Sequence, residues 1–220
     1  MISFKPKQIT KKLLSSLPER ARDVLEKRYG IGTDTDTYTL EAIGQIYGIT
    51  RERVRQIENY GIQSIQKSDV YQEFQPVFDE LTKAIDSLGG GLIAEEALLQ
   101  QLAKDEVTRN HLYFLLVLGD PFYRSKENRS YAHRWYTKKQ VADTVERALR
   151  NVYRSLNEDE LVSEDEVLNR FRTELADLAA EKDEQVLRHW LMISKEISSN
   201  PLGEWGHATS PNVRVKGIRD

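Results

Sequence analysis

The chain has 220 residues, 39% of them apolar and 30% charged, a composition that suits one large folded domain or two to three small ones. No stretch approaches the ~18 uninterrupted apolar residues of a membrane-spanning helix, and the first residues lack the apolar run of a signal peptide. The absence of cysteine excludes disulfides, zinc–thiolate sites and thiol nucleophiles. We therefore expect an intracellular protein that makes no contact with a membrane.

The sequence contains no pattern that indicates catalysis. The four histidines lack HExxH-like spacing. They are His111, His133, His189 and His207. There is no G-x-S-x-G motif and no Walker loop, and residues 89–91 lack the G-x-G-x-x-G form of a dinucleotide site. We expect no metal, no cofactor, no catalytic residue and no enzymatic activity.

Charge is distributed unevenly along the chain. Residues 1–68 hold 12 Lys and Arg against 8 Asp and Glu, whereas the remainder holds 20 against 27. A net charge of +4 over the first segment is modest. A basic N-terminal segment followed by an acidic remainder nevertheless favours a nucleic-acid contact near the N-terminus.

Residues 1–69 are predicted to form a first, helical domain. Helical apolar spacing covers 10–29, with a break at 16–18 and Pro18 in the first turn of the second helix. A polar loop over 30–36 precedes two short helices. These helices are expected at Thr39–Tyr47 and from Arg51 to about Ile65.

Residues 70–137 are predicted to form a linker helix and a first winged-helix-like unit. The expected elements are a linker helix at 71–88, helices at 94–102 and 108–118, and hairpin strands at 122–125 and 131–136. The 108–118 helix is too apolar to read DNA, so only the hairpin offers candidate phosphate contacts. These wing contacts are Arg124, Lys126, Arg129 and Arg134. A solvated hairpin on a protein-binding module is the alternative.

Residues 138–220 are predicted to form a second winged-helix-like unit. The first expected helix has Val141, Val145, Leu149 and Val152 along one face, and the second begins with an S-x-x-E capping box at Ser163. The third expected helix contains Val186, Leu187, Trp190 and Leu191. Strands are expected at Trp205 and 213–218. The expected fold class is therefore mainly α, with a helix-turn-helix domain followed by two winged-helix-like units.

The segment T-L-E-A-I-G-Q-I-Y-G-I-T-R-E-R-V-R-Q-I-E, residues 39–58, meets the requirements of a helix-turn-helix. Gly44 supplies the small residue where the helices cross, Gly48 the turn residue that tolerates positive φ, and Thr50 the N-cap. Five apolar residues occupy the inward positions: Ile43, Tyr47, Ile49, Val54 and Ile57. The outward positions of the second helix are then Arg51, Glu52, Arg53, Arg55, Gln56 and Asn59.

This outward face is chemically suited to the major groove of DNA. Arg can bind the O6 and N7 atoms of guanine, Glu can accept from cytosine N4, and Gln can pair with adenine. A charged helix face on its own is often only a solvated surface. A complete helix-turn-helix in front of it favours DNA reading.

Residues 17–65 closely resemble region 4 of primary (sigma-70-type) bacterial sigma factors, the module that reads the −35 promoter element. The matching text is L-P-E-R-A-R-D-V-L-E-K-R-Y-G-I, then Y-T-L-E-A-I-G, then I-T-R-E-R-V-R-Q-I-E. The resemblance implies base contacts from Arg51, Glu52, Arg55 and Gln56, with Arg53 near bases or phosphate. It also implies DNA-backbone contacts, which position the reading helix, from Arg20, Arg28, Thr39, Leu40 and Glu41.

The resemblance covers about 50 of the 220 residues. The helices with which a sigma factor recruits polymerase and melts the −10 element have no counterpart here, so we expect something other than a complete initiation factor. A second, shorter resemblance lies at 200–220, where N-P-L-G-E-W-G-H-A and V-K-G-I-R-D resemble the segment leading into a HARE-type helix-turn-helix domain. That domain also occurs in the delta subunit of some bacterial RNA polymerases. On this interpretation the chain is cut before a further domain.

These features predict a bacterial, sequence-specific DNA-binding transcription factor that is cytoplasmic and nucleoid-associated. Its expected partners are promoter-like double-stranded DNA and the RNA polymerase core. The alternative is a protein-interaction module that binds RNA polymerase without reading DNA, because region 4 of sigma factors also packs on the polymerase flap. The acidic remainder of the chain after residue 68 and the apolar 108–118 helix favour this alternative. The base-reading residue types on the outward face of the second helix of the helix-turn-helix argue against it. The sequence leaves the oligomeric state open.

Overall fold

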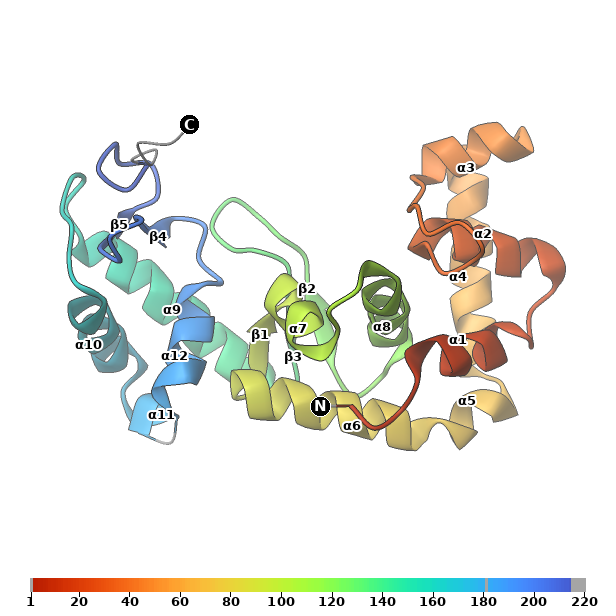
Figure 1. Cartoon of the computed structure of the whole chain (residues 1–220), viewed down its shortest axis with the longest axis horizontal. Coiled ribbons are helices and arrows are strands. Elements are labelled where there is room, and N and C mark those ends of the chain that lie inside the picture. The colour runs from red at the N-terminus through yellow and green to blue at the C-terminus, as the bar shows by residue number, and fades with distance from the viewer. Residues whose placement is uncertain (1, 181, 215–220) are drawn as a thin grey trace. The chain divides into compact units, whose positions relative to one another are not determined.

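The computed structural model describes residues 2–180 and 182–214, and it is mostly helical, as predicted. Backbone contacts divide the chain into two compact units. Unit 1 consists of residues 1–83 and 99–121, and unit 2 consists of residues 84–98 and 122–220. The chain therefore passes from unit 1 to unit 2 and back before it completes unit 2 (Figure 1).

The regular secondary structure in the described residues of unit 1, 2–83 and 99–121, consists of helices. They are α1 (Pro6–Leu14), α2 (Glu19–Tyr29), α3 (Leu40–Tyr47), α4 (Arg51–Gln66), α5 (Asp69–Glu73), the first part of α6 (Gln75–Gly89), the end of α7 (Glu95–Leu102) and α8 (Glu106–Leu118). Asp105 caps α8 by accepting a hydrogen bond from the Thr108 N–H at 2.8 Å. Because α8 packs against α1, α2 and α4, its apolar side chains lie in the core of unit 1. The burial shows that the apolar residues of α8 serve the core, and the expectation that α8 does not read DNA stays a prediction.

Unit 2 combines helices with two small antiparallel sheets. Besides the end of α6 and the start of α7, its elements are β1 (Leu92–Ala94), β2 (Tyr123–Ser125), β3 (Arg134–Tyr136), α9 (Lys139–Ser155), α10 (Glu164–Leu175), α11 (Asp177–Ala180), α12 (Glu184–Leu191), β4 (Ile197–Ser199) and β5 (Trp205–His207). The first sheet has the order β1-β3-β2, and β4 pairs with β5 in the second. In the first sheet Trp135 of β3 lies opposite Ile93 of β1 and Arg124 of β2.

Apolar residues that the sequence predicted on one face of α9 and of α12 form part of the core of unit 2. Val145, Leu149 and Val152 of α9 are buried, and Val141 is partly buried. All four predicted core residues of α12 are buried as well: Val186, Leu187, Trp190 and Leu191. The Trp190 indole N–H lies 2.7 Å from the Gly89 carbonyl oxygen and 3.0 Å from that of Leu92. Trp190 therefore ties α12 to the end of α6 and the start of β1.

Several local expectations require correction. The expected 71–88 helix is two helices separated at Phe74, because Pro76 lacks an N–H and is tolerated only in the first turn of α6. Pro18 is the N-cap of α2 and not a first-turn residue. Strand β1 was not predicted. Its three apolar residues are too few to distinguish a strand from a helix start, and they become a strand by pairing with β3.

The expected pairing near the C-terminus also differs. The partner of β5 is β4, whereas Val213 and Arg214 lie in a turn. Residues 215–220, which carry the rest of the expected strand and part of the HARE-type resemblance, lie outside the described residues. The resemblance at 200–220 therefore stays a prediction.

The compact units do not follow the predicted boundaries of 1–69, 70–137 and 138–220. The element order α6-β1-α7-α8-β2-β3 contains the three helices and the hairpin expected of a first winged-helix-like unit. Contacts place α8 in unit 1 and the hairpin in unit 2, however. The two winged-helix assignments stay predictions.

None of the helices within residues 2–180 and 182–214 is long and apolar enough to cross a membrane. The same residues contain no group of three or more His, Asp or Glu side chains placed to hold a metal ion.

Candidate nucleic-acid interface

Side-chain caps begin both helices of the predicted helix-turn-helix. The Thr39 Oγ1 atom accepts a hydrogen bond from the Ala42 N–H at 3.1 Å and begins α3. The Thr50 Oγ1 atom accepts from the Arg53 N–H at 3.2 Å and begins α4, which confirms the predicted N-cap. The two threonines therefore set where each helix starts.

Two glycines determine the turn between α3 and α4, as the sequence predicted. Gly48 ends α3 with a φ of +64°, a left-handed conformation that costs glycine least. At Gly44, a Cβ atom would lie 2.7 Å from the Ile49 carbonyl oxygen. The absence of a side chain at Gly44 therefore allows the turn to approach α3 closely.

The inward residues of the helix-turn-helix form a small core. Ile43 and Val54 are fully buried with Val24 of α2. The other three predicted inward residues are partly buried against this cluster: Tyr47, Ile49 and Ile57. This packing orients α4 about its axis and leaves its opposite face to solvent.

All five predicted base-reading residues are exposed on α4: Arg51, Glu52, Arg53, Arg55 and Gln56. Four of them pair with one another along the helix. The Arg55 guanidinium donates to both Glu52 carboxylate oxygens at 2.9 and 2.7 Å, and Arg53 donates to the Gln56 side-chain oxygen at 3.0 Å. These Arg55 hydrogen bonds lower the pKa of the Glu52 carboxyl. The face is thus a surface array of donors and acceptors whose present partners lie on the same helix.

Three of the predicted DNA-backbone residues, Thr39, Leu40 and Glu41, lie at the start of α3, and a fourth, Arg20, lies on α2. Thr39 and Glu41 are exposed and Leu40 is half-buried, and the free N–H groups of a helix N-terminus favour a phosphate. Arg20 of α2 is exposed, with its guanidinium 5.4 Å from the centre of the Tyr47 ring.

Arg28, the fifth residue of that set, contacts the protein itself. Its Nε atom lies 3.3 Å from a Glu58 carboxylate oxygen, and its Nη1 donates to the Tyr38 carbonyl oxygen at 3.2 Å. The buried Tyr29 hydroxyl donates to the same Glu58 carboxylate at 3.0 Å, and burial followed by the Glu58 charge raises the pKa of Tyr29. Arg28 and Tyr29 therefore hold α2 against α4, on which Glu58 lies. No local pattern could have indicated this pairing, since Glu58 is 30 residues from Arg28.

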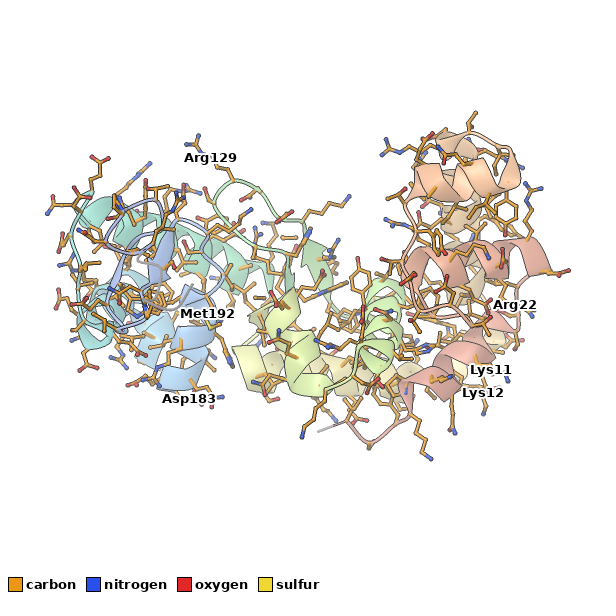
Figure 2. The ribbon with its side chains drawn as sticks, turned by 45° about the horizontal axis from the view of Figure 1, so that its top comes forward. Lys11, Lys12, Arg22, Arg129, Asp183 and Met192 are labelled. Atoms are coloured by element: carbon orange, nitrogen blue, oxygen red, sulfur yellow. The ribbon has the colours of Figure 1, made fainter. Side chains whose placement is uncertain are left out.

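The predicted wing residues, all in unit 2, differ in their surroundings. Arg124 donates two hydrogen bonds to the Glu95 carboxylate at 2.5 and 2.8 Å. Lys126 and Arg129 are exposed in the connection between β2 and β3, where Figure 2 shows Arg129 pointing away from the ribbon. Arg134 must be withdrawn as a phosphate contact. It is 3% exposed, and its guanidinium lies 2.6 Å from the Glu146 carboxylate.

The helix-turn-helix with its buried inward residues and exposed α4 face can now be compared with known proteins. Residues 13–67 match the family model for sigma-70, region 4. RNA polymerase sigma factor SigA of Nostoc sp. is 46% identical over 66 residues, which are 29% of this chain and 17% of that protein. RNA polymerase sigma factor RpoD of Neisseria gonorrhoeae is 40% identical over 70 residues, 30% of this chain and 11% of that protein.

A third relative agrees with these two. RNA polymerase sigma factor SigA1 of Synechococcus elongatus is 48% identical over 54 residues, 24% of this chain and 13% of that protein. The chain thus spans less than a fifth of the length of each of these relatives. The region 4 segment, residues 13–67, runs from the end of α1 to just past α4 and includes the whole helix-turn-helix. The resemblance stated from the sequence is confirmed for this segment.

Proposed function

We propose that this protein is a sequence-specific DNA-binding transcription factor that reads a −35-like promoter element through α4 and acts with RNA polymerase. The observation that carries the proposal is the exposed array on α4, presented by a helix whose inward residues Val54 and Ile57 pack against the helix-turn-helix core. The match of residues 13–67 to sigma-70, region 4 supports the same conclusion. We assign no catalytic step to the protein.

Each residue of the array has a chemical role in this proposal. Arg51 and Arg55 would bind guanine O6 and N7, Glu52 would accept from cytosine N4, and Gln56 would pair with adenine. Binding requires that Arg55 and Glu52 exchange their mutual hydrogen bonds for contacts with bases. Such exposed pairs contribute little to stability, so the exchange costs little.

RNA polymerase is proposed as the protein partner because the relatives are RNA polymerase sigma factors. Binding to polymerase alone would not require the base-reading residue types on the α4 face. We therefore place DNA reading first and treat polymerase binding without DNA as the competing outcome of the experiments.

The direct test measures binding of the full chain to a −35-like duplex and to a scrambled duplex by fluorescence anisotropy. Gln56→Ala should reduce the preference for the −35-like duplex roughly 5- to 150-fold, the loss of one bidentate base contact. Gln63→Ala is the matched control, because Gln63 is exposed on the same helix two turns further on. Arg20→Ala should weaken both duplexes alike and lower the salt slope by about one.

The salt dependence of binding and a selection experiment together distinguish DNA reading from binding to polymerase alone. Contacts with about four to six phosphates predict that log affinity falls with log salt at a slope of roughly −4 to −5. A selection from random duplexes, run with and without polymerase, should recover a −35-like motif. Recovery of no motif in either arm, together with polymerase capture, would replace DNA reading by the protein-interaction alternative.

A further inference from the structure

A cavity of about 610 Å³ opens in unit 1, with a lining that comes from α1, α2, α8 and the loop between α2 and α3. Its volume is in the range of small-molecule sites. Three cationic side chains line it, Lys7 and Lys11 of α1 and Arg22 of α2, against one acid, Glu26. Figure 2 shows Lys11 and Arg22 on the same side of unit 1. The lining thus carries a net positive charge.

Each of the three cations has hydrogen-bond donors left for a ligand. Lys7 and Lys11 are one helical turn apart, and within residues 2–180 and 182–214 neither forms an ion pair. Arg22 donates from Nε to the Leu14 carbonyl oxygen at 3.2 Å and from Nη2 to that of Leu17 at 3.0 Å. These bonds fix the guanidinium at the C-terminal end of α1, while its Nη1 has no hydrogen bond to any described residue.

A buried histidine completes the polar lining. His111 of α8 is 3% exposed, and its Nδ1 atom is buried without a hydrogen-bond partner among the described residues. A buried polar atom without a partner is unfavourable, and a ligand that reached Nδ1 would supply the missing bond. Burial, and then the charge of Lys7, lower the pKa of His111, so the ring is neutral near pH 7 and offers one donor and one acceptor.

The loop between α2 and α3, which forms part of the lining, is held in place before any ligand binds. The Asn110 side-chain N–H donates to the Gly30 carbonyl oxygen at 3.2 Å and to the Thr35 carbonyl oxygen at 3.1 Å. The loop that contributes Ile31, a lining residue, is thereby fixed to α8. Such preorganisation reduces the entropic cost of binding.

The geometry points to a binding site for a small molecule that carries a phosphate or carboxylate group, held between Lys7, Lys11 and Arg22 with His111 as an additional hydrogen-bonding group. Lys7, Lys11 and His111 lie outside the matched residues 13–67, whereas Arg22 lies inside them, so the site combines the region 4 segment with parts of unit 1 beyond it. It does not depend on the proposed DNA-reading function.

The test follows the His111 ring resonances of the full chain by NMR during titration with inorganic phosphate, ADP or citrate at constant ionic strength. The three probes distinguish a bare phosphate, a nucleotide phosphate and a carboxylate. At least one should give a saturable shift of His111. Lys11→Gln should weaken this binding about tenfold or more, the loss of one charge-assisted hydrogen bond.

Lys12→Gln is the matched control, because Lys12 is adjacent on α1 but lies over the Phe74 ring and does not line the cavity. It should leave the affinity within about twofold of wild type, well below the tenfold that one lost contact changes. Equal weakening by both variants would show a general charge effect and overturn the site. The absence of a saturable His111 shift with all three probes would overturn it as well.

Discussion

Gly44→Ala tests whether the close approach of the turn to α3 is essential to the helix-turn-helix. Gly44 is inside a helix, where alanine is favoured over glycine by about 1 kcal/mol. A Cβ atom at this position would lie 2.7 Å from the Ile49 carbonyl oxygen, about 0.7 Å closer than ordinary contact at 3.4 Å. The obstacle is backbone and cannot rotate away, so the turn itself must move.

The steric term should exceed the gain in helix propensity. Overpacking costs typically 1–3 kcal/mol, and a backbone obstacle belongs at the upper end of that range. After the propensity gain is subtracted, we expect Gly44→Ala to destabilise the packing of α3 on α4 by about 2 kcal/mol. Amide hydrogen exchange in these two helices should then accelerate roughly 30-fold.

Gly61→Ala is the matched control for this experiment. Gly61 is also helical and buried, but its added Cβ would meet the terminal methyl of Leu25 at 3.0 Å, which can shift. We expect a change within about 1 kcal/mol, because the propensity gain offsets a small repacking cost. If Gly44→Ala exchanged as slowly as wild type or more slowly, the steric argument for the turn would be refuted.

Substitutions at three further positions probe single contacts. Thr50→Ala should destabilise α4 by about 1 kcal/mol and Thr50→Ser should not, as measured by hydrogen exchange; equal effects would contradict the capping role. Burial raises the pKa of Tyr71 to about 12, above its unfolded value near 10, so stability should fall as pH rises from about 10 to 12. Tyr71→Phe, which also removes the bond to the Leu118 carbonyl, should abolish that part of the pH dependence; an unchanged slope would reject the assignment. Trp190→Phe should lower the melting temperature of unit 2 by leaving the Gly89 carbonyl unpaired, at about 1–3 kcal/mol; an unaltered melt would show that this bond is dispensable.

The helix-turn-helix could be read from the sequence because local signals determine it. The threonine caps, the positive-φ glycine and the spacing of Ile43 and Val54 each act within a few residues. The exposed α4 face followed from the same spacing, since a helix that buries one side must expose the other. The outcome for these elements therefore agrees with the sequence prediction almost residue by residue.

The surroundings of the candidate contact residues required the tertiary structure. Arg28 meets Glu58, Arg124 meets Glu95, and both acids lie about 30 residues away along the chain. In the sequence all these cations resembled free phosphate-binding groups. Distant pairing depends on how helices pack, which periodicity does not specify.

The assignment of α8 shows the same limit at the level of domains. The sequence by itself determined that this helix is apolar, and from that it predicted a helix unsuited to DNA. Only the fold decided that it packs on α1, α2 and α4, and that it thereby helps to form the cavity with His111. An apolar helix gains free energy from any complementary apolar face, so its pattern shows that it is buried without showing against which elements.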